Sequence, residues 1–189
     1  MSNIYLVGFM ASGKTSVGRE LAKKKKWQFV DLDDLIELRE KKTISNIFAQ
    51  NGEPYFRQVE KEVLKTVAKE KHFVVATGGG IVIDTGNIKI MKESGTIICL
   101  TASADVVLKR TKGSTHRPLL NVKNPKKQIE HLLKLRAPYY AKADKTIDTS
   151  RLSIEQVVKK AIQATVERSK VKNQRSKVKV KSQSCKKKK

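Results

Sequence analysis

The chain has 189 residues, 39% of them hydrophobic, and a formal net charge of +23 at pH 7. This length predicts one domain with its own core, and no apolar run approaches the roughly 20 residues that a membrane-spanning helix needs. No signal segment precedes the first apolar run, and the two cysteines, Cys99 and Cys185, do not suggest a disulfide framework. We therefore expect a cytoplasmic protein that binds no membrane.

The positive charge is concentrated at the C-terminal end. Eleven of the 41 Lys and Arg residues and none of the 18 Asp and Glu residues lie in residues 168–189, so residues 1–167 keep 30 basic and 18 acidic side chains. The last segment has too few apolar residues to offset the entropy of ordering it. We predict one domain over residues 1–167, followed by a disordered lysine-rich tail. A basic field favours anionic ligands of any kind, including nucleic acid.

Short apolar segments alternate with amphipathic ones along residues 1–167. The apolar positions of the amphipathic segments recur at helical spacing, and Ser153 is a suitable N-cap for the last of them. In chain order we expect a strand over residues 4–7, a helix over 14–22, a strand over 27–30, helices over 33–40, 45–50 and 54–69, strands over 72–77 and 96–100, helices over 103–110 and 128–135, a strand over 146–148, and a helix over 153–166.

Strands that alternate with helices predict an α/β fold, with a parallel sheet covered on both faces. Such sheets bind ligands at the carboxyl ends of their strands. Unusual residues follow three of the expected strands: a glycine loop at residues 8–15, the pair Asp31 and Asp33, and three glycines at residues 78–80. Because these ends meet at one edge of the sheet, we expect a single site there.

The first of these segments is a phosphate-binding motif. Residues 8–15 read Gly-Phe-Met-Ala-Ser-Gly-Lys-Thr and fit the pattern G-x-x-x-x-G-K-[ST] between a strand and a helix. Glycines let backbone N–H groups surround phosphate oxygens, and the helix directs its positive N-terminus at the same anion. An ordinary glycine turn is the alternative. We expect ATP to contact Gly8, Met10, Ala11, Ser12, Gly13, Lys14, Thr15 and Ser16.

The aspartates and the triple glycine suit a phosphoryl-transfer site. One carboxylate can organise Mg²⁺ and the other can accept a proton from the attacking hydroxyl. Asp31 and Asp33 can equally be helix-capping residues. Consecutive glycines suit a place where a ligand approaches the main chain, or a simple flexible turn.

Three arginines outside the tail are candidates for binding a carboxylate or phosphate, because a planar guanidinium can make two parallel hydrogen bonds to such groups. They are Arg57, Arg117 and Arg136. In so basic a chain each can also be a solvated surface charge. Arg117 lies in a Gly- and Pro-containing segment, about residues 112–125, that has the composition of a mobile lid.

Taken together, these motifs make the chain resemble the shikimate kinase family over nearly all of residues 1–167. The shared features are the P-loop, Asp-x-Asp at 31–33, Phe56-Arg57 with Glu60, the triple glycine at 78–80, Arg-Pro-Leu-Leu at 117–120, and the Arg-Ala-Pro segment that begins at Arg136. The resemblance implies a three-layer P-loop kinase fold of the nucleoside-monophosphate-kinase type, with a central five-stranded parallel sheet. It also implies ATP- and Mg²⁺-dependent phosphorylation of the 3-hydroxyl of shikimate, in the pathway to chorismate and the aromatic amino acids.

The resemblance also implies roles for single residues. Asp33 would hold the acceptor hydroxyl and could act as base, while Lys14 and Arg117 would stabilise charge on the transferred phosphate. The remaining roles fall into three groups: substrate binding by Arg57, Gly79, Gly80 and Arg136; adenine contact by Arg110; Mg²⁺ binding by Thr15 and Asp31.

Two positions depart from the family pattern. Many members have glycine where this chain has Ala11, and a small apolar residue where it has His116. The tail over residues 168–189 is not part of the pattern.

Other functions remain open from the sequence. One is a gluconate or nucleotide kinase of the same fold, and another is a kinase-like domain without catalysis. A third is a nucleic-acid-associated protein that uses the tail, for which we expect weak, non-specific polyanion binding at most. For the kinase we expect a monomer.

Overall fold

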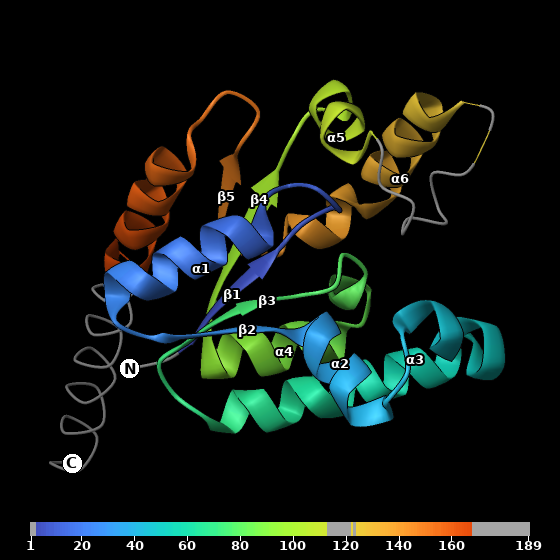
Figure 1. Cartoon of the computed structure of the whole chain (residues 1–189). Helices are drawn as coiled ribbons and strands as arrows, with labels where there is room; N and C mark the ends of the chain where they lie inside the picture. The colour runs from blue at the N-terminus through green and yellow to red at the C-terminus, as the bar shows by residue number, and fades with distance from the viewer. Residues whose placement is uncertain (1–2, 113–121, 123, 168–189) are drawn as a thin grey trace, which may run out of the picture.

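The structure is a computed structural model that describes residues 3–112, 122 and 124–167 (Figure 1). Several sequence expectations fall outside the described residues: His116, Arg117, Cys185, most of the lid expected over residues 112–125, and the tail over residues 168–189. The expected division into a domain and a tail therefore stays a prediction. None of the described helices is long and apolar enough to cross a membrane.

Five parallel strands form the centre of the molecule, in the spatial order β2-β3-β1-β4-β5. This confirms the expected α/β fold with a five-stranded parallel sheet. Parallel pairing aligns the strand ends, because Leu6 lies opposite both Ala76 and Ile98. The strands are β1 (Asn3–Val7), β2 (Gln28–Asp31), β3 (Phe73–Ala76), β4 (Gly95–Thr101) and β5 (Lys145–Asp148).

Helices cover both faces of the sheet and make the three layers visible in Figure 1. Successive residues of a strand point to opposite faces, so β1 contributes to two cores. Ile4 and Leu6 pack with α1 and the helix over residues 154–167, whereas Tyr5 and Val7 pack with helices of the other face. The labelled helices are α1 (Lys14–Lys25), α2 (Leu32–Glu40), α3 (Ile44–Lys69), α4 (Thr85–Ser94), α5 (Ala104–Thr111) and α6 (Pro125–Tyr140), with a 3₁₀ turn η1 (Ile81–Ile83).

The observed elements differ from the expected ones in three places. The expected helices over 45–50 and 54–69 are one element, α3, but the backbone breaks at Gly52 with φ 78° and ψ 171°, where the sequence predicts the stop. The sequence pattern predicts no helix or strand between Gly80 and the fourth strand, whereas the structure has η1 and α4 there. Helix α6 begins at Pro125, capped by Asn124, and continues through Pro138 to Tyr140.

Candidate active site

The P-loop joins β1 to α1 at the carboxyl end of the sheet. Its backbone adopts positive φ at Gly8 (141°), Ala11 (57°) and Gly13 (98°). A Cβ on Gly8 would collide with the carbonyl oxygen of Leu100, so the first glycine is required by packing as well as by conformation. Ala11 occupies a left-handed conformation that costs an L-residue about 1 kcal/mol or more.

The loop orients its own lysine and threonine toward the phosphate site. Lys14 Nζ donates to the carbonyl oxygens of Gly8 and Phe9, at 3.0 and 3.1 Å. The Ser12 hydroxyl oxygen is buried without a hydrogen-bond partner among the described residues. An ammonium group, an unsatisfied hydroxyl and the N-terminus of α1 therefore share one small space, which is an arrangement suited to an anion.

Thr15 and Asp31 fit a magnesium site. The Thr15 hydroxyl donates to Asp31 Oδ2 at 3.0 Å, which brings two oxygen ligands together at the start of α1. Burial raises the pKa of Asp31, although the hydrogen bond from Thr15 acts in the opposite direction. Among the described residues no group of three His, Cys, Asp or Glu side chains could hold a metal. Mg²⁺ commonly takes one or two protein oxygens and fills its other positions with phosphate and water, so this donor set fits it.

Asp33 lies two residues after Asp31, in the first turn of α2. Asp31 is also the N-cap of this helix, since its Oδ1 accepts from the Asp33 N–H at 3.2 Å. Burial, followed by the negative charges of Asp31 and Glu60, raises the pKa of Asp33 to about 7, although Lys14 opposes the shift. Its Oδ1 atom is buried without a hydrogen-bond partner among the described residues. Asp33 is therefore a carboxylate that can exchange a proton near neutral pH.

Arg57 is held on α3 by two glutamates. Its Nη1 atom donates to Glu60 Oε2 at 2.7 Å, and its Nε and Nη2 atoms donate to Glu53 Oε1 at 3.1 and 3.0 Å. The Glu60 side chain has no exposed surface, and burial raises its pKa against the opposing effect of Arg57. The buried glutamate thus fixes the orientation of the guanidinium on a side chain that is 31% exposed.

The three glycines after β3 lie where these charged groups converge. A Cβ on Gly78 would lie 2.7 Å from Glu60 Oε1 and 3.1 Å from Asp33 Oδ1. A Cβ on Gly80 would lie 2.5 Å from Arg57 Nη2, and one on Gly79 would lie 3.3 Å from Arg136 Nη1. Arg136 also lies over the Phe9 ring, with its Cζ atom 5.5 Å from the ring centroid. The triple glycine is therefore a place where side chains would displace the groups that surround it.

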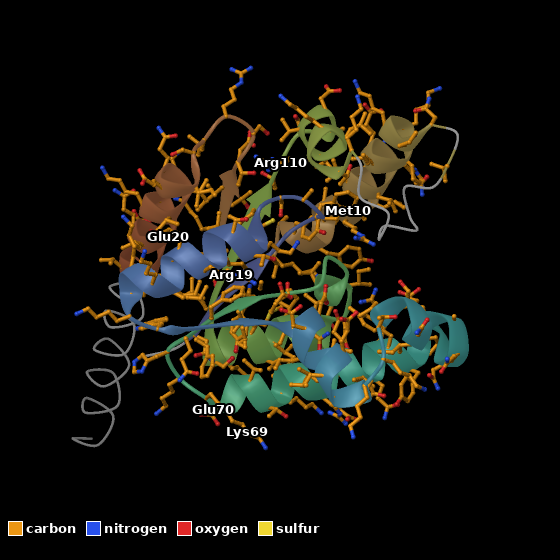
Figure 2. The ribbon with its side chains drawn as sticks, in the orientation of Figure 1. Met10, Arg19, Glu20, Lys69, Glu70 and Arg110 are labelled. Atoms are coloured by element: carbon orange, nitrogen blue, oxygen red, sulfur yellow. The ribbon has the colours of Figure 1, made fainter. Side chains whose placement is uncertain are left out.

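Arg110 and Thr149 support the other end of the P-loop. Arg110 Nη1 donates to the Ala11 carbonyl oxygen at 3.0 Å and to Thr149 Oγ1 at 3.1 Å, while Nη2 donates to the Thr149 carbonyl oxygen at 3.0 Å. Figure 2 labels Arg110 on α5 and Met10 in the neighbouring loop. These bonds hold the guanidinium plane of Arg110 in one orientation against the loop.

A cavity of about 560 Å³ connects these groups. The expected residues Gly8, Arg57, Gly80 and Arg136 do not line it. Thr77, Thr149, Leu152, Ile154 and Val157 line it and were missed, because buried threonines and apolar side chains carry no local signal of ligand binding. The expected residues that line it are Met10, Ala11, Ser12, Gly13, Lys14, Thr15, Ser16, Asp31, Asp33, Gly79 and Arg110.

Comparison with known proteins points to one family. A family model described as shikimate kinase matches residues 10–166. A shikimate kinase of Thermodesulfovibrio yellowstonii is 48% identical over 162 residues, which cover 86% of this chain and 94% of that protein. Another, of Thermoanaerobacter pseudethanolicus, is 43% identical over 166 residues, covering 88% of this chain and 97% of that protein.

Solved structures agree with this result. A shikimate kinase of Acinetobacter baumannii in complex with shikimate has a TM-score of 0.84 and 38% identity, covering 89% of this chain and 94% of that one. A gluconokinase of Sinorhizobium meliloti has a TM-score of 0.56 at 14% identity, covering 93% of this chain and 97% of that one. At that identity it shows a common fold alone.

Proposed function

The chain belongs to the shikimate kinase family and phosphorylates shikimate with ATP and Mg²⁺, and we propose that it does so with Asp33 as the base at the acceptor hydroxyl. In this reaction the 3-hydroxyl oxygen of shikimate forms a bond to the γ-phosphorus, the bond from that phosphorus to the β,γ-bridging oxygen breaks, and ADP leaves. The hydroxyl proton goes to Asp33. The products are shikimate 3-phosphate and ADP.

The observation that carries this role is the environment of Asp33. Its Oδ1 atom is buried without a hydrogen-bond partner among the described residues, and its pKa of about 7 suits a group that takes a proton at neutral pH. Its position at the acceptor end of the cavity, on the strand edge that also carries the P-loop, supports the same role.

On the nucleotide side, we assign the phosphates of ATP to the P-loop backbone and Lys14. On binding, Lys14 would exchange its hydrogen bonds to the Gly8 and Phe9 carbonyl oxygens for phosphate oxygens. Thr15 and Asp31 would hold Mg²⁺, which neutralises charge on the phosphates when bound. Arg110, fixed by Ala11 and Thr149, would support the adenine ring. Arg117, outside the described residues, remains the candidate for stabilising the transferred phosphate.

On the acceptor side, Arg57, Arg136 and the backbone of Gly79 and Gly80 would bind shikimate, with the arginines holding its carboxylate. Glu60 and Glu53 already hold the Arg57 guanidinium in one orientation, which suits this role. The site therefore works mainly by positioning and by stabilising charge, as expected for phosphoryl transfer.

The test is ADP release from ATP and Mg²⁺ with shikimate, gluconate or a nucleoside monophosphate as acceptor. We expect a signal with shikimate alone and a loss of about 10²- to 10⁴-fold in kcat for Asp33→Asn, with the KM for ATP nearly unchanged. Asp34→Asn is the matched control, because Asp34 is exposed on the same turn. Equal kcat in Asp33→Asn and the wild type would remove Asp33 from the proton transfer.

A further inference from the structure

Tyr140, the last residue of α6, makes a hydrogen bond that the catalytic scheme above does not use. Its hydroxyl donates to the carbonyl oxygen of Gly79 at 2.8 Å. The side chain is 5% exposed and belongs to the core on that face of the sheet. Burial raises the pKa of Tyr140 to about 12, with Arg136 opposing the shift, so the phenol keeps its proton near neutral pH.

The bond fixes the orientation of the peptide that joins Gly79 to Gly80. A peptide group is planar and none among the described residues is cis, so the Gly80 N–H points opposite to the carbonyl that Tyr140 holds. Gly80 is buried, and no described residue accepts a hydrogen bond from its N–H. Buried backbone donors are nearly always paired, and Gly79, the other residue of this peptide, lines the cavity, so we assign the Gly80 N–H to a ligand bound beside Gly79.

Tyr140 also connects that peptide to the arginine beside it. Residues four apart lie on the same face of a helix, so α6 presents Arg136 and Tyr140 together. A Cβ on Gly79 would lie 3.3 Å from Arg136 Nη1 and 3.4 Å from the Gly8 carbonyl oxygen of the P-loop. Helix α6 packs against η1, which continues from the triple glycine. Gly79 thus lies between α6 on one side and the P-loop on the other.

We propose that Tyr140 is a positioning residue for shikimate: its hydroxyl holds the Gly79–Gly80 peptide, and thereby the Gly80 N–H, in the orientation that receives the acceptor. This inference rests on the proposed role of Gly79, Gly80 and Arg136 in substrate binding. A glycine pair has many accessible conformations, and a hydrogen bond from a rigid, buried ring restricts the pair before shikimate arrives. A purely structural anchor between α6 and the sheet is the competing interpretation.

The test variant is Tyr140→Phe, which keeps the ring and removes the bond. Tyr139→Phe is its control, because the neighbouring ring is partly exposed and its hydroxyl makes no hydrogen bond to a described residue, while its contact with Lys142 involves the ring. For Tyr140→Phe we expect a KM for shikimate raised about three- to tenfold, the range for one lost hydrogen bond, and a KM for ATP within about twofold of wild type. Tyr139→Phe should change neither.

The melting temperature separates positioning from anchoring. If Tyr140→Phe melts at a lower temperature but keeps the wild-type KM for shikimate, Tyr140 is only an anchor and the inference is wrong. If turnover is too slow to measure, calorimetric titration compares the affinities of the variant and the wild type for shikimate. If the variant is poorly folded at 25 °C, the kinetics and the titration are done at 15 °C. A wild-type enzyme without shikimate-dependent ADP release would instead contradict the proposed function, which Tyr140→Phe does not test.

Discussion

The nucleotide side and the acceptor side of the cavity are built differently. On the nucleotide side one continuous segment, residues 8–15, supplies the backbone groups as well as the side chains of Lys14 and Thr15. On the acceptor side, charged side chains from α2, α3 and α6 meet around three glycines after β3. A substitution on the nucleotide side should affect one ligand, whereas one on the acceptor side should also disturb the packing that brings distant segments together.

Apart from Asp33→Asn, the largest effect we expect is on the nucleotide side. Lys14→Met removes the ammonium group that the P-loop carbonyls orient, and we expect kcat to fall about 10²- to 10³-fold with weaker ATP binding. Shikimate binding to the nucleotide-free enzyme should stay the same. Steady-state kinetics and calorimetric titration of ATP measure both effects, with exposed Lys24→Met on the same helix as control. An unchanged affinity for ATP would show that Lys14 does not bind the phosphates.

Next in size is Arg57→Met on the acceptor side. It leaves the fully buried Glu60 without its partner, which should cost about 2 kcal/mol of unfolding free energy, and it should raise the KM for shikimate about tenfold or more. The double variant Arg57→Met, Glu60→Gln should recover stability but not the KM. Denaturant unfolding and kinetics distinguish the two effects, and recovery of both in the double variant would exclude Arg57 from substrate binding.

The pH dependence should come from the acceptor side. Since Asp33 must be ionised to accept a proton, kcat/KM for shikimate should rise with pH and level off above about 7. Its pKa is raised on folding, so its contribution to stability is full below about pH 4 and is lost as pH rises through about 7. The melting temperature of Asp33→Asn minus that of the wild type should therefore be larger at pH 8 than at pH 5. A flat rate profile from pH 6 to pH 8 would contradict the assignment.

The smallest effect should come from Ala11→Gly. Glycine removes the strain of the left-handed conformation at φ 57° but adds entropy to the unfolded chain. We therefore expect a net gain of about 0.5 kcal/mol in the free energy of unfolding. Gly13→Ala is the opposite change, at φ 98° with only Val17 near the added Cβ, and should destabilise the protein through backbone strain alone. Thermal melts measure both. A lower melting temperature for Ala11→Gly would show that the added entropy of the unfolded chain outweighs the relieved strain.

Residues that act through local patterns could be predicted from the sequence. The P-loop is eight consecutive residues, and the gap expected between the helices over 45–50 and 54–69 matches the break at Gly52. Asp31 had two interpretations, metal ligand or helix cap, and it does cap α2 while also accepting the Thr15 hydroxyl. One side chain has both contacts because the ligand edge of a parallel sheet is also where the following helices begin.

The sequence by itself determined the alternation of strands and helices, the phosphate-binding loop and, through the joint occurrence of the motifs, the family resemblance. Only the tertiary structure decided what surrounds the glycines: Glu60 and Asp33 at Gly78, Arg57 at Gly80, and Arg136 and Tyr140 at Gly79. It also decided that Thr149 reaches the P-loop, accepting from Arg110 and lying 3.1 Å from the Ser12 carbonyl oxygen. These partners are far apart along the chain, and no local propensity encodes a contact that forms only when the order β2-β3-β1-β4-β5 brings the strand ends together.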